Sequence, residues 1–253
     1  MIYHYNQVPI FYQITGKGPA VVLLHGFLER SAMWFQLIPE LMKTKMVITL
    51  DLPGHGKSGS IAGIHSMELM AEVVFSLLKY LKIDTATFIG HSMGGYVTLA
   101  FVEAYEPMMD RLILLNSTSK ADSPERKRNR ERALVVISEN KKLFIGSAIN
   151  NLFTENARHK YPSEIATLKE QAYSFPIEGI KAAIRGMKDR KDRTWVLEKF
   201  RREKYLICGD EDPIIPIADS MAIAAAAQCK LKVLHGGHMS WIENTAEMLK
   251  FCI

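Results

Sequence analysis

The sequence predicts an α/β fold with a mostly parallel central sheet and helices on both faces. Short, almost entirely apolar runs recur along the chain, as expected of strands that are buried on both sides. Amphipathic helical patterns separate these runs, and a strand–helix–strand rhythm implies right-handed crossovers between parallel strands. The 253 residues, 48% of them hydrophobic and 23% charged, suit one continuous core.

The first half of the chain carries this rhythm. Residues 2–5 and 8–15 alternate in polarity around Asn6 and Gln7, which predicts a β-hairpin. Ser66 is the expected N-cap of a helix over residues 66–81. The other expected elements are buried strands at residues 20–26, 46–50, 85–90 and 111–117, and helices around residues 33–42 and 94–106.

The rhythm changes between Thr118 and about Arg193. This segment is charged, has helical patterns and contains no convincing buried strand. The segments KYLICGDEDPIIP and CKLKVLHGGH, residues 204–216 and 229–238, then resume the strand–loop pattern. The sequence therefore predicts a core of residues 1–118 and 194–253, with a helical insertion at residues 119–193.

Composition and charge indicate which classes of protein to exclude. The formal charge of +5 has a local source in SPERKRNRER, residues 123–132, where both signs alternate; this suits a solvated helix face better than a nucleic-acid site. The start of the chain lacks a secretory signal pattern, and no apolar run approaches the roughly 20 residues that cross a bilayer. With only three cysteines, none at metal-ligand spacing, we expect a soluble cytoplasmic protein with free thiols and no membrane partner.

Polar motifs follow the predicted strands at their carboxyl ends, where open α/β sheets collect reactive groups. These motifs are HGF at 25–27, GHSMGG at 90–95, GDED at 209–212 and GGHMSW at 236–241. The second has the form Gly-x-Ser-x-Gly, with Gly90, Ser92 and Gly94 between a strand and a helix. A serine on so sharp a turn projects its hydroxyl above the sheet, and its neighbours must be small.

A serine hydroxyl is a weak nucleophile unless a base removes its proton and a third group orients that base. His238 follows the last predicted strand, and Asp212 follows the strand before it. The chain order Ser92, Asp212, His238 is the one expected when these groups act together on such a sheet.

The motifs LHGF, DLPGHGKS, GHSMGG, GDEDPIIP and GGHMSWIEN resemble the α/β-hydrolase superfamily over essentially the whole chain. The resemblance implies that Ser92 is the nucleophile, His238 the base and Asp212 the acid. It also implies that the backbone N–H groups of Phe27 and Met93 form an oxyanion hole. Residues 119–193 fall where this superfamily carries a helical lid that shapes the acyl pocket.

Neighbouring residues offer alternatives for these roles. Asp210 and Glu211 lie beside Asp212 and could also orient the base, although the family pattern puts the acid directly before PIIP. His235 could compete with His238 as the base, but we expect it to be a packing residue at a strand end. Four other polar residues near the motifs are expected to support loops: His25, Asp51, His55 and His91.

The predicted function is hydrolysis of a small or medium carboxylic ester through an acyl-enzyme. Trp34 and Trp241 are assigned to an apolar substrate pocket, since both lie near the predicted site in the sequence. No metal or other cofactor is expected, because PGHGKSGS lacks the spacing of a phosphate-binding loop and no metal signature is present.

Several other functions are compatible with the same motifs. Ser92 argues against haloalkane dehalogenases and epoxide hydrolases, which resemble this chain but use an aspartate at the same turn. Carbon–carbon bond hydrolases, lactonases, thioesterases and cofactor-free perhydrolases keep the serine. The basic stretch at residues 125–132 also suggests an ester linked to an acidic carrier protein, and a small-ligand receptor on a hydrolase scaffold is the alternative that is not an enzyme.

Overall fold

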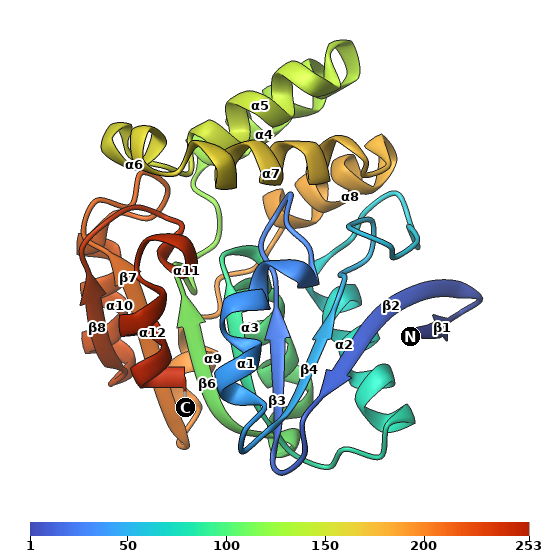
Figure 1. Ribbon diagram of the computed structural model, residues 1–253, viewed down its shortest axis with the longest axis vertical. Coiled ribbons are helices and arrows are strands. Elements are labelled where there is room, and N and C mark those ends of the chain that lie inside the picture. Colours follow the sequence, from blue (N-terminus) through green and yellow to red (C-terminus); the bar gives the residue numbers. More distant parts are fainter. Residues whose placement is uncertain (253) are drawn as a thin grey trace.

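The computed structural model describes residues 1–252 and is built around an eight-stranded sheet (Figure 1). The strand order is β1-β2-β4-β3-β5-β6-β7-β8. The strands are β1 (Ile2–Tyr5), β2 (Val8–Thr15), β3 (Ala20–Leu24), β4 (Met46–Leu50), β5 (Ala86–His91), β6 (Met109–Leu115), β7 (Glu203–Gly209) and β8 (Lys230–Leu234). Only the pairs β1–β2 and β2–β4 are antiparallel, so the predicted mostly parallel sheet is confirmed.

Helices cover both faces of the sheet, as predicted. One face packs against α2 (Met67–Tyr80), α3 (Met93–Tyr105), α9 (Thr194–Lys199) and α10 (Ile217–Ala227). The other face packs against the 3-10 helix η1 (Ser31–Gln36), α1 (Ile38–Leu41), α11 (Ser240–Glu243) and α12 (Thr245–Cys252). A short 3-10 turn, η2 (Glu106–Met108), joins α3 to β6.

Strand β3 shows why the predicted strands are apolar throughout. Successive side chains of a strand point to opposite faces of its sheet. Val22 and Leu24 accordingly pack in the core on the α2–α3 side, while Val21 and Leu23 pack in the core on the α1–α12 side. Because β3 lies between β4 and β5 and both of its faces are covered, each position requires an apolar residue.

Local signals account for most element boundaries. The β1–β2 turn has positive φ angles at Asn6 and Gln7, and the Ser66 side chain accepts a hydrogen bond from the Leu69 N–H at the start of α2. The single helix expected around residues 33–42 is instead split into η1 and α1. Pro39 lies in the first turn of α1 and has no N–H to donate backward, so a continuous α-helix is interrupted there.

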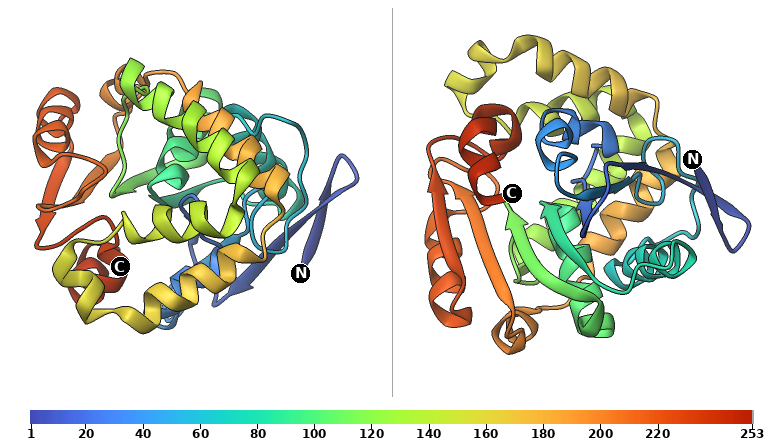
Figure 2. Two further views of the ribbon diagram at one scale, coloured as in Figure 1. Left: turned by 90° about the horizontal axis from the view of Figure 1, so that it is seen from above. Right: turned by 60° about the horizontal axis from the view of Figure 1, so that its bottom comes forward.

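The chain leaves the sheet after β6 and forms five further helices before it returns through α9 to the adjacent strand β7. These are α4 (Pro124–Glu139), α5 (Lys141–Asn150), α6 (Glu155–Lys160), α7 (Pro162–Tyr173) and α8 (Ile177–Lys188). Figure 1 places them beyond the carboxyl ends of the parallel strands, and Figure 2 shows them from above over the middle of the sheet. Within residues 1–252, no helix combines the length and the apolar character needed to cross a membrane.

Candidate active site

Ser92 lies on the sharp turn between β5 and α3. Its φ of 48° and ψ of −113° are uncommon for a residue with a side chain, and such strain costs about 1–3 kcal/mol. The turn also brings the backbone of Gly94 against the carbonyl oxygen of Leu24, where a Cβ atom would clash. The close approach of α3 to the end of β3 therefore requires glycine at position 94, and at position 90 a Cβ atom would meet the Gly94 carbonyl oxygen.

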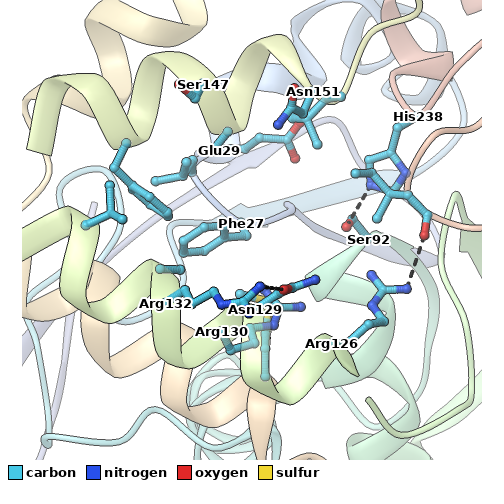
Figure 3. A pocket seen from close by; sticks show the side chains of 18 of the residues that line it. Phe27, Glu29, Ser92, Arg126, Asn129, Arg130, Arg132, Ser147, Asn151 and His238 are labelled. Atoms are coloured by element: carbon cyan, nitrogen blue, oxygen red, sulfur yellow. Dashed lines mark hydrogen bonds between the residues drawn. The ribbon is translucent and has the colours of Figure 1, made fainter. Parts of the chain in front are cut away.

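A chain of hydrogen bonds joins Ser92, His238 and Asp212. The Nε2 atom of His238 lies 2.9 Å from the Ser92 hydroxyl oxygen, as drawn in Figure 3. The Nδ1 atom of His238 lies 2.8 Å and 3.0 Å from the two carboxylate oxygens of Asp212. Because a carboxylate can only accept, Nδ1 carries the proton and Nε2 is free to accept the proton of Ser92.

Asp212 is held in place by donors on several sides. Its Oδ1 atom accepts hydrogen bonds from the backbone N–H groups of Ile214 and Ile215, and Oδ2 accepts one from the side chain of Asn116. Burial alone would raise the pKa of Asp212, but His238 and these hydrogen bonds outweigh it and lower the pKa. The carboxylate therefore stays ionised beside the imidazole.

Asn116 was not singled out from the sequence. It ends the apolar run of β6 with a positive φ of 42° and also donates to the Gly237 carbonyl oxygen. It thus ties the end of β6 to the loops that carry Asp212 and His238. Its position directly after a predicted buried strand was the available signal, since asparagine tolerates the left-handed region better than most residues.

The backbone N–H groups of Phe27 and Met93 face no competing acceptor. Met93 begins α3, where the first N–H groups of a helix have no partner within the helix. Among residues 1–252, neither N–H group forms a hydrogen bond. Phe27 lies in the loop after β3 and lines the same cavity as Ser92. Met93 directly follows Ser92, so the two N–H groups are candidate donors for the predicted oxyanion hole.

A buried network connects the loop after β3 to the turn of Ser92. The Glu29 carboxylate accepts from the Gly26 N–H at 2.6 Å, from the Trp241 indole at 3.2 Å and from Nδ1 of His91 at 2.8 Å. The Nε2 atom of His91 lies 3.0 Å from the His238 carbonyl oxygen. Because both ring nitrogens of His91 face acceptors, the network favours its protonated form.

The pKa values agree with this arrangement. Burial alone would lower the pKa of His91, but the charge of Glu29 and the hydrogen bonds raise it overall. Burial would raise the pKa of Glu29, and His91 reverses that shift. The pair is therefore an ion pair, with each side chain no more than 2% exposed.

The alternative acid and base lie away from Ser92. His235 pairs with Asp210 at the surface, and its side chain is 81% exposed, so the expectation that it packs at a strand end was wrong. The chain turns outward after β8, and the imidazole follows it into solvent. Glu211 is also exposed.

The loops around the site are fixed by other buried polar residues. The Nε2 atom of His25 accepts a hydrogen bond from the Leu52 N–H, and the Asp51 carboxylate accepts from the Ser31 and Lys57 N–H groups. His55 is buried nearby, and burial lowers its pKa well below the ordinary value. These contacts agree with the predicted supporting roles.

Ser92 and His238 open into a cavity of about 610 Å³ between the sheet and the inserted helices. Most of its wall is apolar and comes from α4, α5, the turn after α5 and the loop after β3. The apolar lining residues include Phe27, Ala133, Val136, Leu143, Phe144, Ala148 and Leu152. The cavity is also lined by four residues of the basic stretch, Arg126, Asn129, Arg130 and Arg132 (Figure 3). One side of this stretch therefore faces the cavity, whereas the sequence predicted a solvated helix face.

The assignment of Trp34 and Trp241 to the substrate pocket was wrong. Neither residue lines the cavity, and both are almost fully buried in the core between the sheet and α1. Trp241 acts instead as a donor to Glu29. Proximity in the sequence to a functional residue does not determine which way a neighbouring side chain points.

Comparisons with known proteins agree with this fold. The family model described as alpha/beta hydrolase fold matches residues 19–245. An esterase from Thermogutta terrifontis, solved with malate bound, is 31% identical with a TM-score of 0.91, over 97% of this chain and 92% of that chain. The enol-lactonase of Burkholderia xenovorans LB400 shares the fold, with a TM-score of 0.92 and 24% identity over 100% of this chain and 98% of that chain.

Relatives found by sequence are consistent with these structures. The 3-oxoadipate enol-lactonase 2 of Acinetobacter baylyi is 24% identical over 242 residues, which cover 94% of this chain and 90% of that protein. The hydrolase fold, the match over residues 19–245 and the relatives together identify the chain as a hydrolase that belongs to the alpha/beta hydrolase fold family.

Proposed function

We propose that the protein hydrolyses small or medium carboxylic esters through an acyl-enzyme on Ser92. The observation that carries this proposal is the continuous hydrogen-bond chain from Asp212 through His238 to Ser92, which ends in a mostly apolar cavity. The chain supplies a nucleophile, a base with the correct tautomer and an ionised acid that stabilises the imidazolium.

The reaction has two half-reactions. His238 Nε2 takes the proton of Ser92 while the serine oxygen forms a bond to the ester carbonyl carbon, and the resulting oxyanion accepts hydrogen bonds from the Phe27 and Met93 N–H groups. The bond to the alcohol oxygen then breaks, and His238 gives its proton to the leaving alcohol. Water attacks the acyl-enzyme by the same route and releases the carboxylic acid.

The inserted helices act as a lid in this proposal. Residues 119–193 contribute most of the cavity wall through α4 and α5, which turn apolar side chains such as Ala133, Phe144 and Ala148 toward the cavity. Enclosing the acyl group there excludes water and makes the hydrogen bonds around Ser92 more effective. Specificity for the acyl group accordingly depends on this segment.

Two relatives support this reaction class. The esterase of Thermogutta terrifontis is similar over nearly the whole chain, which favours ester cleavage. The relative from Acinetobacter baylyi is named an enol-lactonase, an enzyme that hydrolyses a lactone. Lactones are cyclic esters, so they are the second class of substrate to test. The same serine chemistry opens both.

A substrate panel tests the proposal. The purified protein is given p-nitrophenyl acetate, butyrate and hexanoate, the matching thioesters and a set of lactones, each beside the Ser92→Ala variant. We expect repeated turnover of esters by the wild type and a loss of at least about 10⁴-fold in kcat in the variant. Hydrolysis that persists in Ser92→Ala would contradict the proposal. If the protein binds one equivalent of ester without repeated turnover, the result would favour the alternative of a small-ligand receptor on a hydrolase scaffold.

A further inference from the structure

Three arginines surround one buried carboxylate beside the cavity. Asp122 lies at the start of the insertion, and its side chain is fully buried. Its oxygens lie 3.3 Å from Nε of Arg126, 3.0 Å from Nε of Arg130 and 2.6 Å from Nη1 of Arg190. Three guanidinium groups against one carboxylate leave a formal surplus of two positive charges at this point.

The cluster is rigid at its base. Arg190 is buried, stacks on the Tyr96 ring at 4.2 Å and donates to two backbone carbonyl oxygens. Burial alone would raise the pKa of Asp122, but Arg130 and Arg190 hold it below its ordinary value. Asp122 therefore remains a fixed anion that orients Arg126 and Arg130 through their Nε atoms.

Arg126 and Arg130 both lie at the wall of the cavity. Both residues line it together with Ser92 and His238, as Figure 3 shows. Arg126 also donates through Nη1 to the carbonyl oxygen of Ile214, two residues after Asp212, which ties the cluster to the acid loop. In the part of the chain that the structure describes, the two terminal nitrogens of Arg130 have no hydrogen-bond partner.

Among residues 1–252, Asp122 is the only carboxylate that contacts Arg126 or Arg130. Glu29 lines the cavity too, but His91 already neutralises it. Glu131, on the same helix, pairs with Lys188. Cations that are partly removed from water in a mostly apolar cavity are stabilised by an anion, and guanidinium groups bind carboxylates with two parallel hydrogen bonds.

We propose that the natural substrate is an ester or lactone with a second group, a carboxylate, and that Arg126 and Arg130 bind this carboxylate while Ser92 attacks the ester carbonyl. The inference rests on the proposed function, which it deepens by naming the substrate class. The apolar residues that line the same cavity, among them Phe27, Phe144 and Leu152, suit the methylene chain that joins the carboxylate to the ester. The two arginines act as specificity-determining residues.

Matched substrates test this inference directly. Mono-p-nitrophenyl esters of glutaric, adipic and pimelic acid are compared with the same esters in which a neutral carboxamide replaces the free carboxylate. We expect the wild type to prefer the carboxylate over the carboxamide by at least about 10-fold in kcat/KM at one or more chain lengths, as charge-assisted hydrogen bonds predict.

Variants on one helix distinguish direct binding of the carboxylate from a general effect of positive charge near the site. Arg126→Gln and Arg130→Gln should each reduce the preference by about 10-fold, mainly through KM. Arg128→Gln removes the same charge from an exposed position of α4 that does not line the cavity, so it should keep the preference. If Arg130→Gln does not fold, Arg126→Gln decides, because its side chain is 34% exposed and tolerates replacement more readily.

The outcomes distinguish this inference from the proposed function. Equal turnover of carboxylate and carboxamide esters at all three lengths would overturn the inference and leave the esterase proposal standing. A preference that both cavity variants keep, or that Arg128→Gln reduces as strongly as they do, would also overturn it. If the wild type hydrolyses neither type of ester, nor the simple esters of the panel, the proposed function itself fails.

Discussion

Glu29 and His91 form a buried ion pair, with 2.8 Å between the Glu29 Oε2 and His91 Nδ1 atoms, between the loop that carries Phe27 and the turn that carries Ser92. The pair also reaches the His238 carbonyl oxygen through the other ring nitrogen of His91. Three segments that are far apart in the sequence are thereby held together around the reacting groups. The pair thus positions the segments of Phe27, Ser92 and His238 without taking part in the reaction itself.

Glu29→Gln should slow catalysis with little effect on substrate affinity. The neutral amide weakens the hydrogen bond that fixes the Gly26 N–H, so the Phe27 N–H is less well aimed at an oxyanion. We expect kcat to fall by about 10-fold while KM changes little, measured with p-nitrophenyl butyrate. Glu211→Gln, an exposed glutamate near the site, is the control. Equal effects of the two variants would show that the contacts of Glu29 are unimportant.

The contribution of His91 to stability should depend on pH. Its folded pKa lies above the ordinary value of 6.5, so its stabilisation is complete below pH 6.5 and is lost as the pH rises through the raised pKa. The pKa of Glu29 lies below its ordinary value of 4.5, so its stabilisation is complete above pH 4.5 and is lost as the pH falls through the lowered pKa.

The difference in the free energy of unfolding between the wild type and His91→Gln should therefore be largest between pH 4.5 and 6.5. Breaking a buried pair costs on the order of 3 kcal/mol, and the difference should decline at higher pH. Urea denaturation at several pH values measures it, and titrations of other groups cancel in the comparison. A difference that grows with pH would be inconsistent with a protonated His91.

Asp212→Asn should abolish most of the activity, and Asp210→Asn should not. An asparagine cannot hold the Nδ1–H tautomer of His238 as a carboxylate does, so we expect kcat to fall by about 10³–10⁴-fold. Asp210 is bound to the exposed His235 and should be replaceable with little change in kcat. Steady-state rates of the two variants compare the neighbouring candidates directly. A severe loss in Asp210→Asn alone would reverse the assignment.

The sequence was sufficient to predict that Ser92, Asp212 and His238 lie near one another. Parallel strands end at one edge of a sheet, so residues directly after buried runs meet there whatever lies between them. Spacing alone could not show which side chains line the cavity. Trp34 is buried because η1 packs against the sheet, a contact that depends on tertiary structure.

The basic stretch illustrates the same limit. Arg126 and Arg130 are four residues apart and share one side of α4, whereas Lys127 and Arg128 point to solvent. The sequence predicted a helix with alternating charges, but the buried partner of the two arginines, Asp122, lies before the helix and is identified only by the fold. The role of a run of charged residues can therefore be inferred only once it is known which side of the helix faces the protein.

Covalent labelling of Ser92 tests the central claim most directly. A p-nitrophenyl alkylphosphonate reacts once with an activated serine, releases p-nitrophenol and leaves a stable adduct that mimics the tetrahedral intermediate. We predict one equivalent of p-nitrophenol for each chain, a single adduct that peptide mass spectrometry places on Ser92, and no adduct in Ser92→Ala. An adduct on another residue, or an unlabelled wild type that still hydrolyses esters, would contradict the account.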